Sequence, residues 1–399
     1  MKNIIVILDG ASGWELEELD GQTTLEAAAT PMLDLMALQG KVGLAETVFE
    51  GLEPSSAAAC TSILGFDPAT YCIGRAAIEA AAMGITLDDD EVALRVNTLT
   101  IENGIMRSYA GGHISTDESR AIIERLAAEL DDEVFTLYPG VAYRHILVVK
   151  GHPELLETTY TPPHDISDKP VADYLPTDPG AALLADYTAR AHALLAHDPT
   201  NEARVAAGLL PITDLWPFWP GTAPARLPSF QETFGATAAL TSGVDLLFGL
   251  ARLFGITPLA IDGVTDGPDN DYVAQVTGAL AALDEHDVVI IHVESPDEMA
   301  HAGDMAGKIL AIEDIDQSIM TRVFAYGRQH DDVRVLALPD HPTPIALKTH
   351  VRAHVPFLLW GNGVAPDQAS EYSERAAAET GWSLLGPALM GTLLERDDA

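Results

Sequence analysis

The sequence has very few cysteines and no apolar run long enough to cross a membrane. Its two cysteines, Cys60 and Cys72, are too few for a disulfide framework in a chain of 399 residues. No apolar run approaches the roughly 20 residues of a membrane span. The N-terminal MKNIIVILDG lacks a signal-peptide cleavage site and its apolar run ends early in an aspartate. We therefore expect a cytoplasmic protein.

Positive charge is also scarce. The chain has 22 basic residues, only six of them lysine, against 60 acidic residues, which gives a net charge of −38 at pH 7. Nucleic acid and anionic membranes are polyanions and are poor partners for such a chain. The acids are spread along the sequence, so a solvated acidic shell explains them, with adaptation to a saline habitat left open. An anionic substrate would need local arginines or metal ions to overcome this field.

The length predicts two domains, or one large domain with an insertion, and 47% hydrophobic residues suffice for a large core. Four near-continuous apolar runs are typical of strands buried on both faces of a parallel sheet: 3–8, 288–293, 333–338 and 355–360. Three segments between or after them have the three- and four-residue spacing of helices: 271–284, 307–327 and 368–395. This alternation predicts an α/β, doubly wound architecture.

The middle of the chain has a different pattern. VALRVNTLTIENGIMRSYAG alternates around Asn103-Gly104, which predicts a β-hairpin. A helix over 118–130 and a strand over 143–151 follow, so we expect an inserted α+β module. The proline-rich segments 159–170 and 214–224 are predicted to be ordered loops or connections between the two parts.

Acidic residues follow three of the predicted core strands. Asp9, Glu294 and Asp340 come at the ends of apolar runs, and His341 follows directly. Ligands of open α/β sheets collect at the carboxyl ends of strands, so these acids should converge. Asp297 and His301 stand four residues apart, on one face of a helical turn. Oxygen and imidazole ligands without thiolates suit Mn²⁺, Mg²⁺ or Zn²⁺, and two such ions are the usual apparatus of phosphoryl transfer.

An ordered set of motifs carries a resemblance to a known family. An Asp-Gly pair ends the first strand, and SSAAACTSILGFDP, GRAAIEAA, DEMAHAGD, IEDID and PDHPTP with KTH follow in that order. The chain resembles the archaeal-type cofactor-independent phosphoglycerate mutases of the alkaline phosphatase superfamily, essentially from end to end. The resemblance implies an alkaline-phosphatase-like core with a mostly parallel sheet flanked by helices, formed by residues 1–77 and 210–399. It also implies an inserted α+β substrate-binding cap domain at 78–209.

The resemblance further implies an isomerase of glycolysis and gluconeogenesis that interconverts 3-phosphoglycerate and 2-phosphoglycerate through a phosphoserine. It would use two divalent metal ions, Mn²⁺ foremost and Mg²⁺, Zn²⁺ or Co²⁺ as alternatives, and no 2,3-bisphosphoglycerate. Its partner would be a small anionic phosphometabolite, with homo-oligomerisation left open. A metal-dependent phosphomonoester hydrolase, another phosphomutase and a catalytically silent phosphometabolite-binding paralogue remain as alternatives.

Carried over residue by residue, the family's roles place two metal ions and a nucleophile. One metal ion would be held by Asp297, His301 and His350. The second would be held by Asp9, Asp340, His341 and the nucleophile, which the motif places at Ser56. A metal-bound serine hydroxyl has a lowered pKa and attacks as an alkoxide.

The segment around Ser56 departs from the pattern Gly-Ser-Asp-x-x-His. Ala57 stands where that acid would be, and Cys60 stands where the histidine would be. Neither residue replaces the lost polar group, so the positioning of the phosphate and the choice between mutase and hydrolase stay open. Ser55 is a competing nucleophile.

Substrate recognition requires cations for a phosphate and a carboxylate, and the planar fork of arginine suits both. Six residues lie in segments that resemble the family's substrate-binding segments: Arg75, Arg95, His113, Arg144, Lys169 and Arg204. Surface ion pairing is the alternative for each arginine. His145, His164 and His354 are predicted to be structural.

Overall fold

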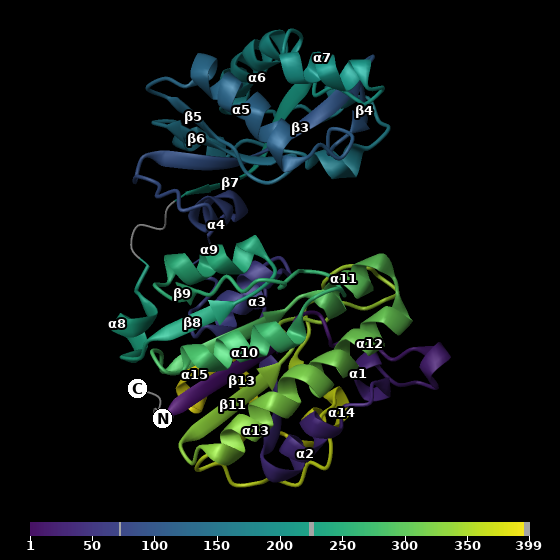
Figure 1. The fold of residues 1–399 in the computed structure, drawn as a ribbon, viewed down its shortest axis with the longest axis vertical. Helices are drawn as coiled ribbons and strands as arrows, with labels where there is room; N and C mark the ends of the chain where they lie inside the picture. The colour runs from purple at the N-terminus through teal and green to yellow at the C-terminus, as the bar shows by residue number, and fades with distance from the viewer. Residues whose placement is uncertain (72, 223–226, 395–399) are drawn as a thin grey trace. The chain divides into compact units, whose positions relative to one another are not determined.

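The computed structural model describes residues 1–71, 73–222 and 227–394. The chain divides into two compact units (Figure 1). The first unit joins residues 1–72 to 227–399, and the second is continuous from 73 to 226. No helix in the described ranges is both long and apolar enough to cross a membrane.

The first unit is built on an eight-stranded sheet with the order β13-β2-β12-β11-β1-β10-β8-β9. The sheet is mostly parallel, as predicted, and the runs at 3–8, 288–293 and 333–338 form adjacent parallel strands. The run at 355–360 was also predicted to be parallel, and this is wrong, because it forms β12, which runs against both of its neighbours. Its strands are β1 (Lys2–Leu8), β2 (Lys41–Glu46), β8 (Ala238–Thr241), β9 (Thr257–Pro258), β10 (Val288–Val293), β11 (Val333–Leu338), β12 (Val355–Gly361) and β13 (Ser383–Leu385).

Helices flank this sheet. Ile4, Val6 and Leu8 of β1 point to one face, where they join a buried cluster with residues of α2, α10, α12 and α13. The helices of this unit are α1 (Thr24–Ala27), α2 (Pro31–Gln39), α3 (Ser56–Ile63), α8 (Phe230–Phe234), α9 (Asp245–Leu253), α10 (Tyr272–Ala282), α11 (Ser295–Ala302), α12 (Met305–Ile315), α13 (Thr321–Gln329), α14 (Glu374–Thr380) and α15 (Gly386–Leu393), with the 3₁₀ turn η1 (Glu17–Leu19). The predicted helix at 271–284 is confirmed as α10.

The predicted helix at 307–327 is confirmed, but it contains a π-helical turn, η5 (Asp316–Met320), between α12 and α13. The buried Asp316 carboxylate in this turn accepts the backbone N–H groups of Met32 and Leu33 at 3.0 and 2.7 Å. It thereby caps the N-terminus of α2, whose own N-cap residue makes no side-chain bond.

The predicted helix at 368–395 is wrong. The segment forms α14, then strand β13, then α15, and its last residue, Glu395, lies outside the described residues. Gly381 ends α14 in the left-handed conformation at φ 68°, and Pro387 lies in the first turn of α15, where no backbone N–H is needed. Helical spacing of apolar residues continues across both boundaries, which is why the pattern concealed them.

The second unit has a five-stranded antiparallel sheet with the order β4-β3-β6-β5, and β7 pairs with β3. Its strands are β3 (Glu91–Glu102), β4 (Ile105–Ser108), β5 (Phe135–Tyr138), β6 (Arg144–Lys150) and β7 (Asp214–Thr222). Its helices are α4 (Arg75–Ala82), α5 (Thr116–Leu130), α6 (Ala181–Leu195) and α7 (Pro199–Ala206), with 3₁₀ turns η2 (Pro153–Leu156), η3 (Pro163–Ile166) and η4 (Val171–Tyr174).

The predicted hairpin is confirmed. Asn103 and Gly104 both have positive φ, 52° and 76°, and join β3 to β4. The helix expected at 118–130 and the strand expected at 143–151 are also confirmed, as α5 and β6.

The prediction that 214–224 is a connecting loop is wrong for its described part. Residues 214–222 form β7, which pairs only with β3 and lies at the sheet edge, where proline is tolerated. Helix α4 also packs on β3 and β7. The second unit therefore begins at residue 73 and ends at 226, wider than the predicted 78–209. The segment 159–170 lies inside this unit and holds η3.

His145 is fully buried in the second unit and is neutral there. Its Nδ1 accepts the N–H of Gly140 at 3.1 Å, and its Nε2 lies 2.9 Å from Ser119 Oγ. Burial lowers the pKa of His145 to about 3, and the charges of Arg95 and Arg120 add to the shift.

This pKa shift predicts a pH dependence of stability. Between the folded pKa and the ordinary value near 6.5, the unfolded chain binds the additional proton, so the unfolding free energy falls as pH falls through this range. The slope reaches about 1.4 kcal/mol per pH unit. Urea unfolding at about pH 7 and pH 5 should show a smaller loss of stability for His145→Gln than for the parent chain. Equal losses in the two proteins would contradict the assignment.

Candidate metal centre

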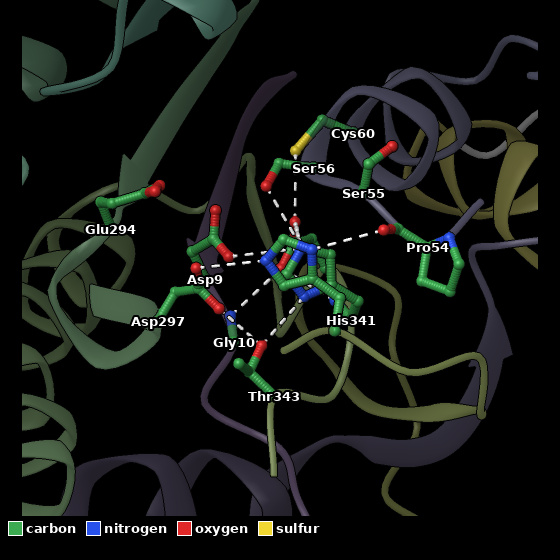
Figure 2. Close-up of polar contacts among 12 residues, drawn as sticks. Asp9, Gly10, Pro54, Ser55, Ser56, Cys60, Glu294, Asp297, His341 and Thr343 are labelled. Atoms are coloured by element: carbon green, nitrogen blue, oxygen red, sulfur yellow. Dashed lines mark hydrogen bonds and ion pairs between the residues drawn. The ribbon is translucent and has the colours of Figure 1, made fainter. Parts of the chain in front are cut away.

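The carboxyl ends of β1, β10 and β11 bring the predicted acids together. The three strands are adjacent and parallel, with β1 in the centre. Asp9 follows β1, Glu294 follows β10, and Asp340 follows β11. Asp340 and Glu294 each have a donor atom within 4.8 Å of a donor atom of Asp9, and Figure 2 shows Asp9 and Glu294 at this edge of the sheet. Gly10 allows this close approach, because it has φ 60° and a Cβ there would collide with the side chain of Asp297.

Asp297, His301 and His350 form the first group of donor atoms. The Asp297 Oδ2 atom lies 3.0 Å from His301 Nε2 and 3.4 Å from His350 Nε2. The two Nε2 atoms are 2.9 Å apart. Each Nδ1 lies beside a backbone carbonyl, that of Lys348 for His301 and that of Pro54 for His350. A carbonyl only accepts, so each Nδ1 carries a hydrogen and the Nε2 lone pairs of the neutral rings face one another.

The electrostatics of this group favour a positive charge between the side chains. The hydrogen bond to Asp297 raises the pKa of His301 to about 9. Burial raises the pKa of Asp297, but its bonds to His301 and His350 outweigh that effect and hold the pKa well below the ordinary value. A proton meets this demand when no cation is bound, and a divalent cation would replace it.

Asp9, Asp340 and His341 form the second group, and all three are fully buried. The His341 Nε2 atom lies 3.1 Å from Asp340 Oδ2 and 3.7 Å from Asp9 Oδ1. Thr343 Oγ1 donates its one hydrogen to Asp297 Oδ1 at 2.5 Å, so it accepts from His341 Nδ1 at 3.2 Å. The Nε2 of a neutral His341 is therefore bare, and it faces carboxylate oxygens of Asp340 and Asp9 that carry no hydrogen to donate.

A divalent cation fits both groups. Asp9 Oδ1 is buried and has no hydrogen-bond partner among the described residues. Burial raises the pKa of Asp9 well above its ordinary value, and the charges of Asp340 and Asp297 raise it further. Buried carboxylates in such numbers, facing bare imidazole nitrogens, lack a compensating positive charge. The oxygen and nitrogen donors suit Mn²⁺, Mg²⁺, Co²⁺ or Zn²⁺.

Ser56 lies beside the second group, and Ser55 does not. Ser56 Oγ is 3.2 Å from His341 Nε2, and Ser56 is the first residue of α3. Ser55 is the N-cap, and its hydroxyl oxygen accepts the N–H of Ala58 at 3.3 Å. In Figure 2 the Ser56 side chain points to the acids and imidazoles, whereas the Ser55 oxygen points away.

Cys60 lies one turn of α3 after Ser56 and is buried. Its Sγ is 3.8 Å from Asp340 Oδ2. Burial raises the pKa of the Cys60 thiol well above its ordinary value, and Asp340 and Asp9 raise it further, so the sulfur stays protonated. The thiol therefore donates a weak hydrogen bond to a carboxylate of the second group.

Two side chains of the centre, His292 and Lys308, were not predicted, and Glu294 was predicted to converge with the other acids but was given no ligand role. His292 within β10 places Nε2 2.7 Å from Asp9 Oδ2, and Glu294 joins these two in a third group of donors. Lys308 donates to the carbonyls of Ser12 and Thr343 at 3.0 and 2.9 Å, which ties together the loops after β1 and β11. Burial lowers the pKa of Lys308 to about 8. A histidine inside an apolar strand and a lysine inside an apolar helix face were the available signals.

The second unit brings three of the predicted substrate-binding arginines close to one another. Arg95 is buried, and burial lowers its pKa, with smaller lowering effects from Arg75 and Arg144. Glu79 Oε1 accepts from Arg75 Nε at 3.0 Å and from Arg95 Nη1 at 2.6 Å. Arg144, at the start of β6, is exposed.

Arg204 does not resemble a substrate-binding residue in this structure. It is buried, and its guanidinium donates to the carbonyls of Leu210 and Gly111 and to Glu118. His113 and Lys169 are exposed, and Lys169 Nζ donates to the carbonyl of Asp165. His354 is exposed and belongs to neither group of the centre.

The fold and the centre define an α/β protein with clustered carboxylate and imidazole donors beside a serine at a helix N-terminus, an arrangement suited to phosphoryl transfer. A family model described as 2,3-bisphosphoglycerate-independent phosphoglycerate mutase matches residues 37–201. Proteins of that name from Methanothrix thermoacetophila and Methanosarcina barkeri are 42% and 39% identical to this chain. The alignments cover 96% of this chain and 97% and 96% of those proteins. The chain belongs to the 2,3-bisphosphoglycerate-independent phosphoglycerate mutase family.

Two solved structures share the fold. A Pyrococcus horikoshii protein is 26% identical with a TM-score of 0.82, and the match covers 100% of this chain and 98% of that one. A cofactor-independent phosphoglycerate mutase from Thermoplasma acidophilum is 24% identical with a TM-score of 0.69, over 99% of both chains. The α/β architecture with an inserted unit thus extends to both proteins.

Proposed function

We propose that this protein interconverts 3-phosphoglycerate and 2-phosphoglycerate through a phosphoserine at Ser56, without 2,3-bisphosphoglycerate. Relatives that carry this activity in their names align with nearly the whole chain. The observation that supports the mechanism best is the 3.2 Å separation of Ser56 Oγ from His341 Nε2, beside two groups of carboxylates and imidazoles.

Two divalent cations complete the proposed site, with Mn²⁺ as the first candidate and Mg²⁺, Zn²⁺ or Co²⁺ as alternatives. Asp297, His301 and His350 would hold one, and Asp9, Asp340, His341 and Ser56 would hold the other. When bound, such cations lower the pKa of a hydroxyl and neutralise charge on phosphoryl oxygens.

Ser56 attacks the phosphorus of the substrate in the proposed reaction. A bond forms from Ser56 Oγ to phosphorus, the ester bond between phosphorus and the glycerate oxygen breaks, and the serine proton passes to that released oxygen, which becomes a hydroxyl. The N–H groups of Ser56 and Ala57, in the first turn of α3, bond to none of the described residues and can donate to phosphoryl oxygens. These backbone N–H groups would bind the phosphate in place of the acidic side chain that Ala57 lacks.

The second half reverses the first on the other hydroxyl of the glycerate. The phosphoryl group leaves Ser56 for that hydroxyl, and the proton returns to the serine. Water must be kept out in between, because a hydrolysed phosphoserine would make the enzyme a phosphatase. On the second unit, Arg75, Arg95 and Arg144, with His113 and Lys169, are the proposed residues for the anionic groups of the substrate.

One assay separates this function from its alternatives. The metal-loaded protein is incubated with 3-phosphoglycerate, and 2-phosphoglycerate and free phosphate are followed together. We expect 2-phosphoglycerate with little phosphate. Phosphate without 2-phosphoglycerate would establish a hydrolase. Neither product, with Mn²⁺, Mg²⁺, Zn²⁺ and Co²⁺ each tried, would support a silent phosphometabolite-binding paralogue.

Removal of divalent cations should abolish turnover and destabilise the protein. A cation that binds only the folded chain, present at about 100 times its Kd, adds about 2.7 kcal/mol to the unfolding free energy. Urea unfolding with Mn²⁺ and with EDTA measures this difference. Identical unfolding curves, together with full activity in EDTA, would exclude a catalytic cation.

A further inference from the structure

Trp219 has an unusual backbone conformation inside strand β7. Its φ is 49°, in the left-handed region that bulky side chains avoid. Among the described residues it is the one non-glycine residue within a strand that has a positive φ. Such strain persists only where the surrounding structure enforces it, and it concentrates at functional sites.

A β-bulge accompanies this conformation. Ala93 of β3 faces Gly221 and Arg95 faces Phe218, so Trp219 and Pro220 together lie opposite Leu94. Consecutive residues of a regular strand point to opposite faces of the sheet. Here Phe218 and Trp219 contact the same guanidinium, since Arg95 Cζ lies 5.7 and 5.9 Å from their ring centroids. The bulge and the positive φ therefore turn the Trp219 ring to the arginine side.

The Trp219 ring covers one face of Arg75. Arg75 Cζ lies 4.3 Å from the ring centroid, a close cation–π contact. His164 and Phe218 pack against the same ring, with centroid distances of 5.6 and 4.6 Å. The ring is thus fixed from two sides and defines where the guanidinium lies.

The two Nη atoms of Arg75 are unpaired within the described residues. Its Nε donates to Glu79, but its two Nη atoms form no hydrogen bond or ion pair with any described residue. Its side chain is 48% exposed. Arg75 and Arg95 share the Glu79 carboxylate, which is the one ion-pair partner of either within the described residues, and Arg144 adds a third positive charge near Arg95. An unpaired guanidinium edge in such a positive cluster is suited to an oxyanion.

We infer that Trp219 is a positioning residue, which holds Arg75 in the orientation that binds an oxyanion group of the phosphoglycerate. The inference rests on the proposed function, because it takes the substrate to be a phosphoglycerate. The strained strand orders the long arginine side chain before the substrate arrives, so less conformational entropy is lost on binding.

A double-mutant cycle tests the inference in the full-length, metal-loaded protein. The Kd of 3-phosphoglycerate is measured by calorimetry, and KM by turnover, for the parent, Trp219→Gly, Arg75→Ala and the double variant. Trp219→Gly should weaken binding about 10-fold in the parent and hardly at all in the Arg75→Ala background. Trp219→Phe, which keeps an aromatic ring, should change Kd less than Trp219→Gly. Asp20→Gly relieves a positive φ in the first unit and should leave Kd unchanged.

The outcomes separate this inference from the proposed function. A tenfold loss from Trp219→Gly in both backgrounds, or in neither, would overturn the positioning role. If the four proteins show the expected dependence of the Trp219→Gly effect on Arg75, but the parent forms no 2-phosphoglycerate, the proposed function alone would be overturned. A parent protein that does not bind 3-phosphoglycerate overturns both.

Discussion

Replacement of Ser56 by alanine is expected to lower kcat by at least about 1,000-fold, because no other described side chain offers a hydroxyl beside His341 Nε2 at this point. The substitution removes the nucleophilic oxygen and leaves the N-cap of α3 intact. The unfolding free energy should therefore change by no more than about 0.5 kcal/mol. Production of 2-phosphoglycerate and urea unfolding measure the two quantities on the same preparations.

Ser55→Ala is the matched control for this prediction. Ser55 caps α3 through its bond from Ala58 N, so alanine there should cost about 1 kcal/mol of stability. Activity should stay within about tenfold of the parent, because the Ser55 hydroxyl serves the helix and not the reacting atoms. An inactive Ser55→Ala variant beside an active Ser56→Ala variant would reverse the assignment of the nucleophile. A phosphorylated peptide from quenched enzyme, sequenced by mass spectrometry, identifies the residue directly.

The second large effect is expected from Asp297→Asn. Asp297 Oδ2 is the shared neighbour of His301 Nε2 and His350 Nε2, while Oδ1 accepts from Thr343. The amide keeps nearly the same shape and removes the negative charge that the cation requires. We expect the affinity of the first group for Mn²⁺ to fall at least about 100-fold, and turnover at fixed Mn²⁺ to fall with it. Calorimetric titration with Mn²⁺ should show that the metal-free Asp297→Asn variant binds one ion fewer than the metal-free parent protein.

Glu298→Gln controls for the loss of charge on the same helix. Glu298 is the next residue of α11, is exposed, and contributes to none of the donor groups. The Glu298→Gln variant should bind as many Mn²⁺ ions as the parent protein and remain active. Asp297→Asn protein that still binds as many Mn²⁺ ions with unchanged affinity would refute the ligand role of Asp297.

Much of the first unit follows from short-range sequence patterns. The runs that became β1, β10, β11 and β12 are apolar on both faces because helices cover both faces of their sheet. Once three parallel strands are adjacent, Asp9, Glu294 and Asp340 must meet at one edge. The sequence predicted the convergence of these acids because it depends only on strand direction and strand ends.

Features that depend on long-range geometry were not predictable in the same way. The prolines around Trp216, Phe218 and Trp219 led to the prediction of a loop. The segment is a strand because it pairs with β3, and the local sequence pattern does not indicate this pairing. The separate tasks of Ser55 and Ser56 depend on which residue begins α3. The guanidinium of Arg204 donates hydrogen bonds to Gly111 and Glu118, which are far away in the sequence, so its burial could not be predicted from its own segment.

The position of β1 between β10 and β11 has a consequence for how the chain folds. Asn3 pairs with Val288 and Arg334, and the cap that Asp316 gives to Leu33 joins residues 283 positions apart. Strand β1 therefore has no partner until residues up to β10 have been synthesised. The sheet of the second unit, in contrast, uses only strands between residues 73 and 226.

Such distant parallel pairings form slowly, and an unpaired apolar strand is prone to aggregate while it waits. The five strands of the second unit can therefore pair during synthesis, whereas the edge of the first sheet that carries Asp9, Glu294 and Asp340 is assembled only after β10 and β11 have been made.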